Sequence, residues 1–361
     1  MLINETNPHG GQIYNKKVKL DFSVNVNPLG TPETVVEQAY KGILEAAKYP
    51  DANCSDLREA IAQRDNVSKD FVICGNGGAE LIFQAVAALK PKRALIIEPT
   101  FCEYRQSLEN HQCQIDTYQL SEAKYFDINI EIEEILKQVT PEVEMVFLCN
   151  PNNPTGLATS KKAVEKLIHQ CHKVGALLFV DESFGELTDG YERFSIIDQV
   201  SKYDNLFVLK SMTKTYAIAG IRLGYGLCSN RGLLEKMCRN VQCWNVSMVA
   251  QMAGVAALKC KEYTQESTAL ISKERNYMID ELMKLGIKVF PGKANYLMLH
   301  CEKNLYKLLL QKEILVRSCA NFKGLKKNYY RIAIKKHSEN QKLINAITEI
   351  YNEVGRCTKQ V

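Results

Sequence analysis

Six short runs of apolar residues recur through the middle of the chain. They are the segments 71–74, 93–98, 144–149, 176–181, 205–210 and 223–228. Each run is continuously apolar rather than alternating with polar residues, which is typical of strands covered by helices on both faces. Amphipathic stretches between them, such as 78–90 and 160–173, predict helices. This alternation predicts an α/β domain built on a largely parallel sheet.

The pattern changes in the last third of the chain. Residues 246–285 predict helix with little strand signal. Beyond them, helices are expected at about 303–312 and 338–353, between short strands in "KVFP", "NYLMLH", "ILVRSC" and "YYRIAI". One long helical pattern, 32–47, lies near the start and is expected to pack with this smaller α+β domain. We therefore predict a large domain over 48–261 and a small domain formed by 1–47 and 262–361.

Composition narrows the class of protein. With 361 residues, 46% hydrophobic and 24% charged, the chain is typical of a globular protein with more than one core. The net charge of +5 comes without a basic block that interleaves aromatic residues, which argues against nucleic acid as a partner. The start lacks a signal-peptide core and no apolar span reaches 18 residues, which predicts a cytoplasmic protein with no membrane segment.

The thirteen cysteines do not form a metal-binding or disulfide pattern. Their number is odd, they are scattered through apolar runs, and no two have the CxxC spacing. Zinc sites usually show such paired spacing, and disulfide frameworks belong to short secreted chains. We therefore expect no metal and a reduced protein.

Polar and glycine-rich motifs follow three of the predicted strands. "GNGGAE" (75–80) opens a helix, "NPNNPTG" (150–156) contains Asn153, and "VDESFG" (180–185) contains Asp181. Ligands of open α/β sheets bind at the carboxyl ends of strands, and a glycine-rich helix start can bind a phosphate. A buried carboxylate such as Asp181 needs a cationic partner. The alternatives are a tight turn for the first motif, a plain loop for the second, and a metal ligand or helix cap for Asp181.

One lysine, Lys214, lies in the weakly polar stretch "SMTKTYAIAGIRLGY" (211–225). Such surroundings and a cationic neighbour lower a lysine's pKa and so favour the neutral, nucleophilic amine. This predicts a covalent anchor for an aldehyde cofactor. Ser211, Thr213 and Arg222 offer hydroxyl and guanidinium donors suited to its phosphate. The alternative is a surface lysine in a salt bridge.

The order of these motifs resembles that of the fold-type I pyridoxal 5′-phosphate enzymes of the aspartate aminotransferase superfamily. GNG, NPNNPTG, DES, SMTK and RLGY occur in the family's order, and the resemblance covers almost the whole chain. It implies a large domain with a mostly parallel seven-stranded sheet, a small α+β domain and a pyridoxal 5′-phosphate cofactor. By this resemblance Lys214 binds the cofactor aldehyde, Asp181 pairs with the pyridine nitrogen, and Asn153 contacts O3′.

The resemblance also implies the rest of the cofactor site. Phe101, in "EPTFCEY", would stack on the ring, and Tyr49, in "KYPD", would reach the phosphate of the other subunit of a homodimer. Ala79 departs from the family, whose members often carry a hydroxyl or acidic residue there, so one cofactor hydrogen bond is expected to be missing. The phosphate ligands would be Gly77, Gly78, Ser211, Thr213 and Arg222.

Two groups of the superfamily compete for the reaction. "HGG" (9–11), "DFSVNVNPLG" (21–30) and "ILVRSCANFKGL" (314–325) resemble the threonine phosphate decarboxylases of cobalamin biosynthesis more than the histidinol-phosphate aminotransferases. Phe184 agrees, because the aminotransferases usually have a tyrosine there. Serine phosphate and threonine phosphate both remain as substrates, since one methyl group is worth only about 1–3 kcal/mol in a pocket.

Two arginines in apolar strands, Arg317 and Arg331, should each face an anion or an internal carboxylate. A phosphorylated amino acid supplies two anions. The resemblance assigns its carboxylate to Arg331 and its phosphate to Arg317 and His9. Asn25 and the backbone of Gly10 and Gly11 would close that side.

Three functions follow from these residues. The first is a decarboxylase, in which the carboxylate stands perpendicular to the cofactor ring. The second is an aminotransferase, in which the same residues set Cα–H perpendicular and Lys214 moves the proton. The third is a non-enzymatic ligand-binding module, against which the presence of Lys214 argues.

Overall fold

The computed structural model describes residues 9–357, with side chains as far as Asn352. A central sheet of seven strands has the order β2-β8-β7-β6-β5-β3-β4. Its strands are β2 (Val72–Gly75), β3 (Arg93–Glu98), β4 (Gln114–Gln119), β5 (Met145–Cys149), β6 (Leu177–Asp181), β7 (Leu206–Ser211) and β8 (Gly224–Leu227). Neighbours are parallel except for β8, which runs antiparallel to both β2 and β7. The mostly parallel α/β sheet expected from the sequence is therefore confirmed.

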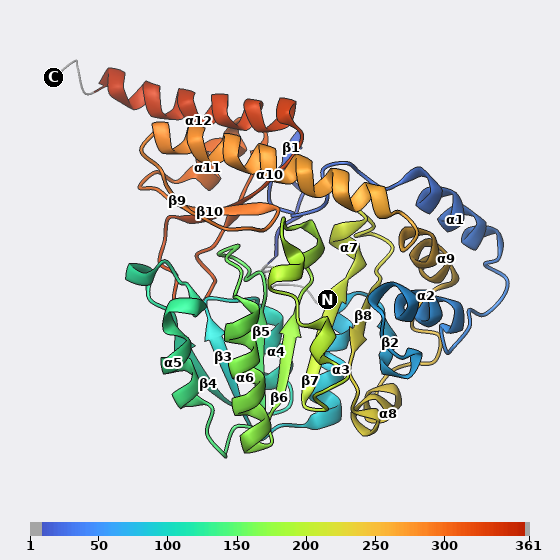
Figure 1. Ribbon diagram of the computed structural model, residues 1–361. Coiled ribbons are helices and arrows are strands. Elements are labelled where there is room, and N and C mark those ends of the chain that lie inside the picture. Colours follow the sequence, from blue (N-terminus) through green and yellow to red (C-terminus); the bar gives the residue numbers. More distant parts are fainter. Residues whose placement is uncertain (1–8, 358–361) are drawn as a thin grey trace.

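Helices cover both faces of this sheet (Figure 1). One face packs on α3 (Gly78–Leu89), α4 (Cys102–Glu109) and α8 (Arg231–Arg239), and the other on α2 (Ser55–Asp65), α5 (Ile128–Gln138) and α6 (Lys161–Val174). Along β5, Phe147 belongs to the first core while Val146 and Leu148 belong to the second. Because successive side chains point to opposite faces, a strand buried on both sides must be continuously apolar.

A second, four-stranded sheet lies over the carboxyl end of the first. Its order is β12-β13-β10-β9 and all its pairs are antiparallel. The strands are β9 (Lys288–Phe290), β10 (Tyr296–His300), β12 (Arg317–Ser318) and β13 (Tyr329–Ala333). Figure 1 shows the covering helices α10 (Lys261–Lys284), α11 (Leu305–Gln311) and α12 (His337–Cys357) on the side away from the central sheet.

The N-terminal part of the chain contacts both layers. β1 (Leu20–Asp21) pairs in parallel with β11 (Ile314–Leu315), next to the second sheet. α1 (Glu33–Leu44) instead packs on α9 (Met248–Ala257), which lies beside the central sheet. The domain division at residues 47/48 and 261/262 stays a prediction, and its second boundary coincides with the start of α10.

Three local differences from the sequence prediction have physical reasons. β4 was not predicted, because it is a partly exposed edge strand that reads QIDTYQ rather than an apolar run. The helical stretch 246–285 is two helices, α9 and α10, that are separated at residues 258–260. The predicted strand at 314–319 is divided, since β11 pairs with β1 whereas β12 pairs with β13.

Candidate active site

A cavity opens at the carboxyl ends of β5, β6 and β7, below the second sheet. Its lining combines strand ends of the large layer with side chains from the N-terminal segment, β12 and β13. Among the predicted site residues, it contains His9, Gly10, Asn25, Gly78, Ala79, Phe101, Asn153, Asp181, Ser211, Thr213, Lys214, Arg222, Arg317 and Arg331. Residues more than 300 positions apart in the chain thus meet in one place.

Lys214 lies in the one-turn helix α7 (Met212–Thr215), directly after β7. Burial, with Arg331 and Arg222 nearby, lowers the pKa of Lys214 from 10.5 to about 8. Its Nζ has no hydrogen bond or ion pair to any residue that the structure describes. This lowered pKa gives Lys214 a larger fraction of neutral amine near neutral pH than an ordinary lysine has, and the neutral amine is the form that attacks an aldehyde.

A second lysine, Lys210, lies four residues earlier and differs from Lys214 in the partners of its Nζ. It is 3% exposed, and its Nζ is 2.6 Å from a Glu186 carboxylate oxygen and 2.6 Å from the Tyr191 hydroxyl. Arg64 also binds Glu186, at 2.6 Å. Lys210 is therefore held in a buried ion cluster, which leaves Lys214 as the available amine.

Asp181 ends β6 and faces the cavity from its floor. One carboxylate oxygen accepts a hydrogen bond from the Tyr104 hydroxyl at 2.7 Å, and the other accepts one from the backbone N–H of Ser183 at 2.9 Å. Burial raises the pKa of Asp181, although the hydrogen bonds from Ser183 and Tyr104 oppose this shift. Neither donor carries a charge, so the carboxylate is suited to a cationic group such as a protonated ring nitrogen.

The start of α3 and Arg222 form a cradle for an anion. Gly77 precedes the helix with φ +86°, and a Cβ at this position would lie 2.4 Å from Nη2 of Arg222. Only glycine permits this close approach of the guanidinium to the helix N-terminus. The hydroxyls of Ser211 and Thr213 lie 2.7 Å apart on the same cavity. Unpaired N–H groups, two hydroxyls and a guanidinium together match a phosphate.

Asn153 and Arg331 are joined across the cavity. Nη1 of Arg331 donates to Oδ1 of Asn153 at 2.6 Å, and Nη2 donates to the Ser23 carbonyl at 2.9 Å. Nε of Arg331 is buried and has no partner among the described residues, and the same holds for the side-chain amide of Asn25. Burial lowers the pKa of Arg331. Unpaired donors beside a buried guanidinium are costly, and an anionic ligand would satisfy them.

Arg317 lies at the outer side of the cavity, on β12. Its Nη2 donates to Oδ1 of Asn321 at 2.7 Å, and its guanidinium lies 5.5 Å from the Phe322 ring. Burial lowers its pKa as well. Arg317 lines the cavity, and its predicted role toward an anion stays a prediction.

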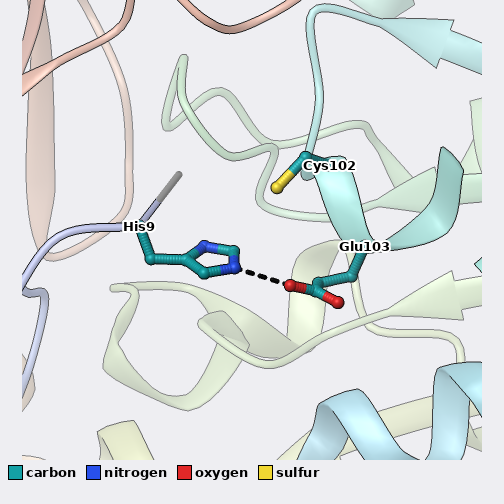
Figure 2. Close-up of side chains that lie close together, drawn as sticks. All are labelled: His9, Cys102 and Glu103. Carbon is teal, nitrogen blue, oxygen red and sulfur yellow. Dashed lines mark hydrogen bonds and ion pairs between the residues drawn. The ribbon is translucent and has the colours of Figure 1, made fainter. Parts of the chain in front are cut away.

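His9 meets the start of α4 at the mouth of the cavity (Figure 2). Nε2 of His9 lies 2.6 Å from Oε1 of Glu103, and the His9 ring lies 5.7 Å from that of Phe101. Cys102 brings its sulfur close to both, and donor atoms of His9, Cys102 and Glu103 lie within 4.8 Å of one another. Burial raises the pKa of the Cys102 thiol to about 11.

Three predicted residues are outside the cavity lining. Tyr49 is 76% exposed and stacks on Trp244, with ring centroids 4.2 Å apart. Gly11 donates its N–H to Oγ of Ser23 at 2.8 Å. Gly77 belongs to the cradle, against Arg222, but not to the cavity lining. The roles predicted for these three residues stay predictions.

The structure adds residues that the sequence reasoning missed. Ser23 joins Arg331 to the N-terminal segment, Tyr104 and Ser183 hold Asp181, and Glu103 binds His9. Tyr104 and Glu103 could have been identified from the sequence, because both lie in the motif "EPTFCEY" that contains Phe101. The contact of Arg331 with the Ser23 carbonyl could not be predicted from the sequence, because every residue type has a backbone carbonyl.

Comparisons with known proteins show the family to which this chain belongs. The profile of the family described as "Aminotransferase class I and II" matches residues 17–347. The chain is 36% identical over 340 residues to the threonine-phosphate decarboxylase of Salmonella typhimurium, covering 93% of this chain and 92% of that protein. It is 30% identical over 338 residues to the histidinol-phosphate aminotransferase of Methanosphaera stadtmanae, covering 90% and 89%.

The crystal structure of the histidinol-phosphate aminotransferase from Clostridium acetobutylicum superposes with a TM-score of 0.86 at 32% identity, over 92% of this chain and 99% of that one. The chain belongs to the class I and II aminotransferase family. Aminotransferase class I and II proteins of this kind use pyridoxal 5′-phosphate, and this is its cofactor. The expected fold-type I architecture is confirmed by the same neighbours.

The residues of the cavity fit this cofactor. The cradle of Gly77 and Arg222 excludes a side chain where a phosphate needs close approach, and Asp181 is buried with no cationic partner between residues 9 and 352. Lys214 lines the same cavity, close enough to Arg222 for that guanidinium to lower its pKa. No helix in the described residues is both long and apolar enough to cross a membrane.

Proposed function

We propose that the protein decarboxylates L-threonine O-3-phosphate to (R)-1-amino-2-propanol O-2-phosphate and carbon dioxide, as part of cobalamin biosynthesis. The observation that carries this proposal is the pairing of Arg317 with Arg331 on adjacent strands at the cavity wall. A phosphorylated amino acid offers one anion to each guanidinium. The 36% identity to a threonine-phosphate decarboxylase supports the choice of substrate.

The substrate would be oriented by three groups of this chain. Arg331, held by Asn153 and by the Ser23 carbonyl, would bind the α-carboxylate. Arg317 and His9, which line the same cavity, would bind the phosphate. The amide of Asn25, buried and without a partner among the described residues, would donate to a substrate oxygen. Two fixed anions define the rotation about the substrate's Cα–N bond.

That rotation decides the reaction. The cofactor, when bound, supplies an aromatic ring that takes up the electron pair of a Cα bond standing perpendicular to it. With the phosphate held by Arg317, the bond from Cα to the carboxylate would take this position and carbon dioxide would leave. The amine of Lys214 would then return a proton to Cα, since its pKa of about 8 suits proton transfer near neutral pH.

We propose the following roles for the cofactor-binding residues. Lys214 binds the aldehyde, Asp181 faces the ring nitrogen, Asn153 faces O3′ and Phe101 stacks on the ring. The phosphate would be held by Gly77, Gly78, Ser211, Thr213 and Arg222. Ala79 has no polar side chain to add to this set.

The second candidate is transamination of a phosphorylated substrate, favoured by the similarity to histidinol-phosphate aminotransferases. Phe184 argues against it, because it lacks the hydroxyl that a tyrosine would direct to the cofactor. Product analysis by NMR after incubation with L-threonine O-3-phosphate separates the two. Aminopropanol phosphate formed without any 2-oxoacid supports decarboxylation. Amino transfer from glutamate to imidazole-acetol phosphate at a comparable rate would reject it.

We also propose a cytoplasmic homodimer with shared sites. Val36, Tyr40, Ile43 and Leu44 are exposed on α1, and Tyr49 and Trp244 are exposed beside it. Exposed apolar side chains gathered on one region are typical of an interface. Analytical ultracentrifugation should give twice the chain mass. Replacement of Tyr49 by alanine should weaken cofactor binding if this residue reaches the site of the other subunit.

A further inference from the structure

The cavity is strongly cationic, yet it contains Glu103 close to the subsite proposed for the substrate phosphate. Within the described residues, Glu103 and Asp181 are the two acidic side chains that line the cavity. Asp181 is engaged by Tyr104 and Ser183 on the floor. Glu103 lies at the mouth and its side chain is 13% exposed. A carboxylate repels a neighbouring phosphate, so its presence beside a phosphate subsite needs a structural explanation.

The residue that Glu103 contacts, His9, explains why a carboxylate lies at this position. Oε1 of Glu103 lies 2.6 Å from Nε2 of His9, a short distance for a hydrogen bond between nitrogen and oxygen (Figure 2). Glu103 is the second residue of α4, where the helix N-terminus favours a negative side chain. The carboxylate is therefore fixed by a helix that packs on the central sheet.

His9 lies in a segment without regular secondary structure. Residues 9–19 form no helix or strand. The His9 side chain forms the hydrogen bond to Glu103 and also a ring contact with Phe101, 5.7 Å between centroids at 45°. Further along the segment, Gly11 is bound to Ser23. A hydrogen bond at one ring nitrogen sets which proton the other nitrogen carries and where it points.

We propose that Glu103 is a positioning residue for the phosphate subsite, fixing the His9 ring so that the imidazole acts together with Arg317 on the substrate phosphate. This inference rests on the proposed function only for the identity of the substrate. It concerns binding of the phosphate group and leaves the cofactor residues unaffected, because Glu103 contacts none of Lys214, Asp181 and Arg222.

Positioning of His9 and simple charge repulsion predict opposite changes in phosphate affinity when Glu103 is removed. If Glu103 acted only through its charge, its removal would strengthen phosphate binding. If it positions His9, removal weakens binding. Glu103→Ala should raise the Kd of the holoenzyme for inorganic phosphate about tenfold, as expected for the loss of one hydrogen bond to a charged phosphate. Isothermal titration calorimetry on the cofactor-loaded protein measures this directly.

Two further variants distinguish the loss of His9 positioning from a general destabilisation of α4. Glu103→Gln keeps an acceptor oxygen and should recover most of the lost affinity. Glu109→Ala, at the exposed end of the same helix, is the matched control and should leave the Kd unchanged. In a double-mutant cycle, His9→Ala combined with Glu103→Ala should be no weaker than His9→Ala alone. The cofactor absorbance should be that of the wild type in every variant.

Kinetics provide a second readout. For L-threonine O-3-phosphate, Glu103→Ala should raise KM about tenfold with kcat changed less than twofold, because the lost contact is made in the ground state and the transition state alike. Unchanged or tighter phosphate binding in Glu103→Ala would overturn the proposal. Weaker phosphate binding without any decarboxylation would leave it standing and reject the proposed reaction instead.

Discussion

Arg317 and Arg331 are direct cross-strand partners on the antiparallel strands β12 and β13. Partners in such a pair direct their side chains to the same face, and like charges in this position destabilise a sheet. Arg317 contributes to lowering the pKa of Arg331, although burial is the larger cause. A ligand with two negative groups would compensate two guanidinium groups held together in this way.

Replacing Arg317 should therefore affect the substrate and not the cofactor. Arg317→Ala should raise KM for L-threonine O-3-phosphate about 100-fold, since a buried charged contact is worth about 2–5 kcal/mol. The Kd for pyridoxal 5′-phosphate should not change. Arg231→Ala, an exposed arginine paired with Glu235, is the control. Equal loss of substrate and cofactor affinity would show that Arg317 is structural.

The two lysines should respond in opposite ways. Lys214→Ala should abolish the absorbance of covalently bound cofactor near the visible edge. Lys210→Met should retain this absorbance but lower the free energy of unfolding by about 3 kcal/mol, because it breaks a buried ion cluster around Glu186. Absorbance spectra and urea titrations of the two variants test this. If the absorbance persisted in Lys214→Ala, the anchor would have been assigned to the wrong lysine.

The pKa of Lys214 predicts how cofactor binding depends on pH. Below about 8 the amine in the apoprotein is mostly protonated, and above it the nucleophilic neutral form dominates. The rate at which pyridoxal 5′-phosphate binds covalently to apoprotein should rise about tenfold from pH 6.5 to pH 8 and then level off. A rate that kept rising towards pH 10 would indicate an ordinary, unperturbed lysine. Stopped-flow absorbance provides the measurement.

The same shift has a consequence for stability. The folded-state pKa is lower than the unfolded value of 10.5, so the unfolded chain binds more protons between about pH 8 and 10.5. Stability of the apoprotein should therefore rise with pH through that window, and Lys214→Met should reduce the rise. Below pH 8, Lys214→Met should stabilise the apoprotein by about 2 kcal/mol. Urea unfolding at pH 7 and pH 10 gives both values.

Gly77 is expected to be essential for the phosphate cradle. Gly77→Ala would place a methyl group 2.4 Å from Nη2 of Arg222, and the Kd for pyridoxal 5′-phosphate should rise about tenfold from the lost contact. Gly175→Ala is the matched control, because Gly175 also has a positive φ, of +78°, but has open space around it. Both should lose about 1 kcal/mol of stability from backbone strain. Equal cofactor affinity in the two variants would argue against the cradle.

Much of the central sheet could be predicted because burial on both faces leaves a simple pattern. β3 begins and ends where the apolar run does, and β5, β6 and β7 differ from their predicted bounds by one residue. β4 lacked the signal because an edge strand is only partly buried. The strand order, with β8 antiparallel between β2 and β7, depends on long-range pairing that local pattern does not encode.

In the candidate site, too, some residues could be predicted from local sequence whereas others are brought together only by the fold. Lys214, Asp181 and Arg331 could be singled out because charged residues in apolar surroundings are costly without a ligand. The hydrogen bond from His9 to Glu103 could not, since it joins residues 94 positions apart whose types are ordinary on any surface. The distinction between Lys210 and Lys214 likewise needed Glu186, which only the fold brings to Lys210.

The most direct test of the proposed reaction counts carbon dioxide. L-threonine O-3-phosphate labelled in its carboxyl group is incubated with purified holoenzyme in the absence of any 2-oxoacid, and the released label is collected. The account predicts many equivalents of labelled carbon dioxide per active site, with loss of release in Arg331→Ala. Retention of the label in the substrate, or in a keto acid formed by amino transfer, would contradict it.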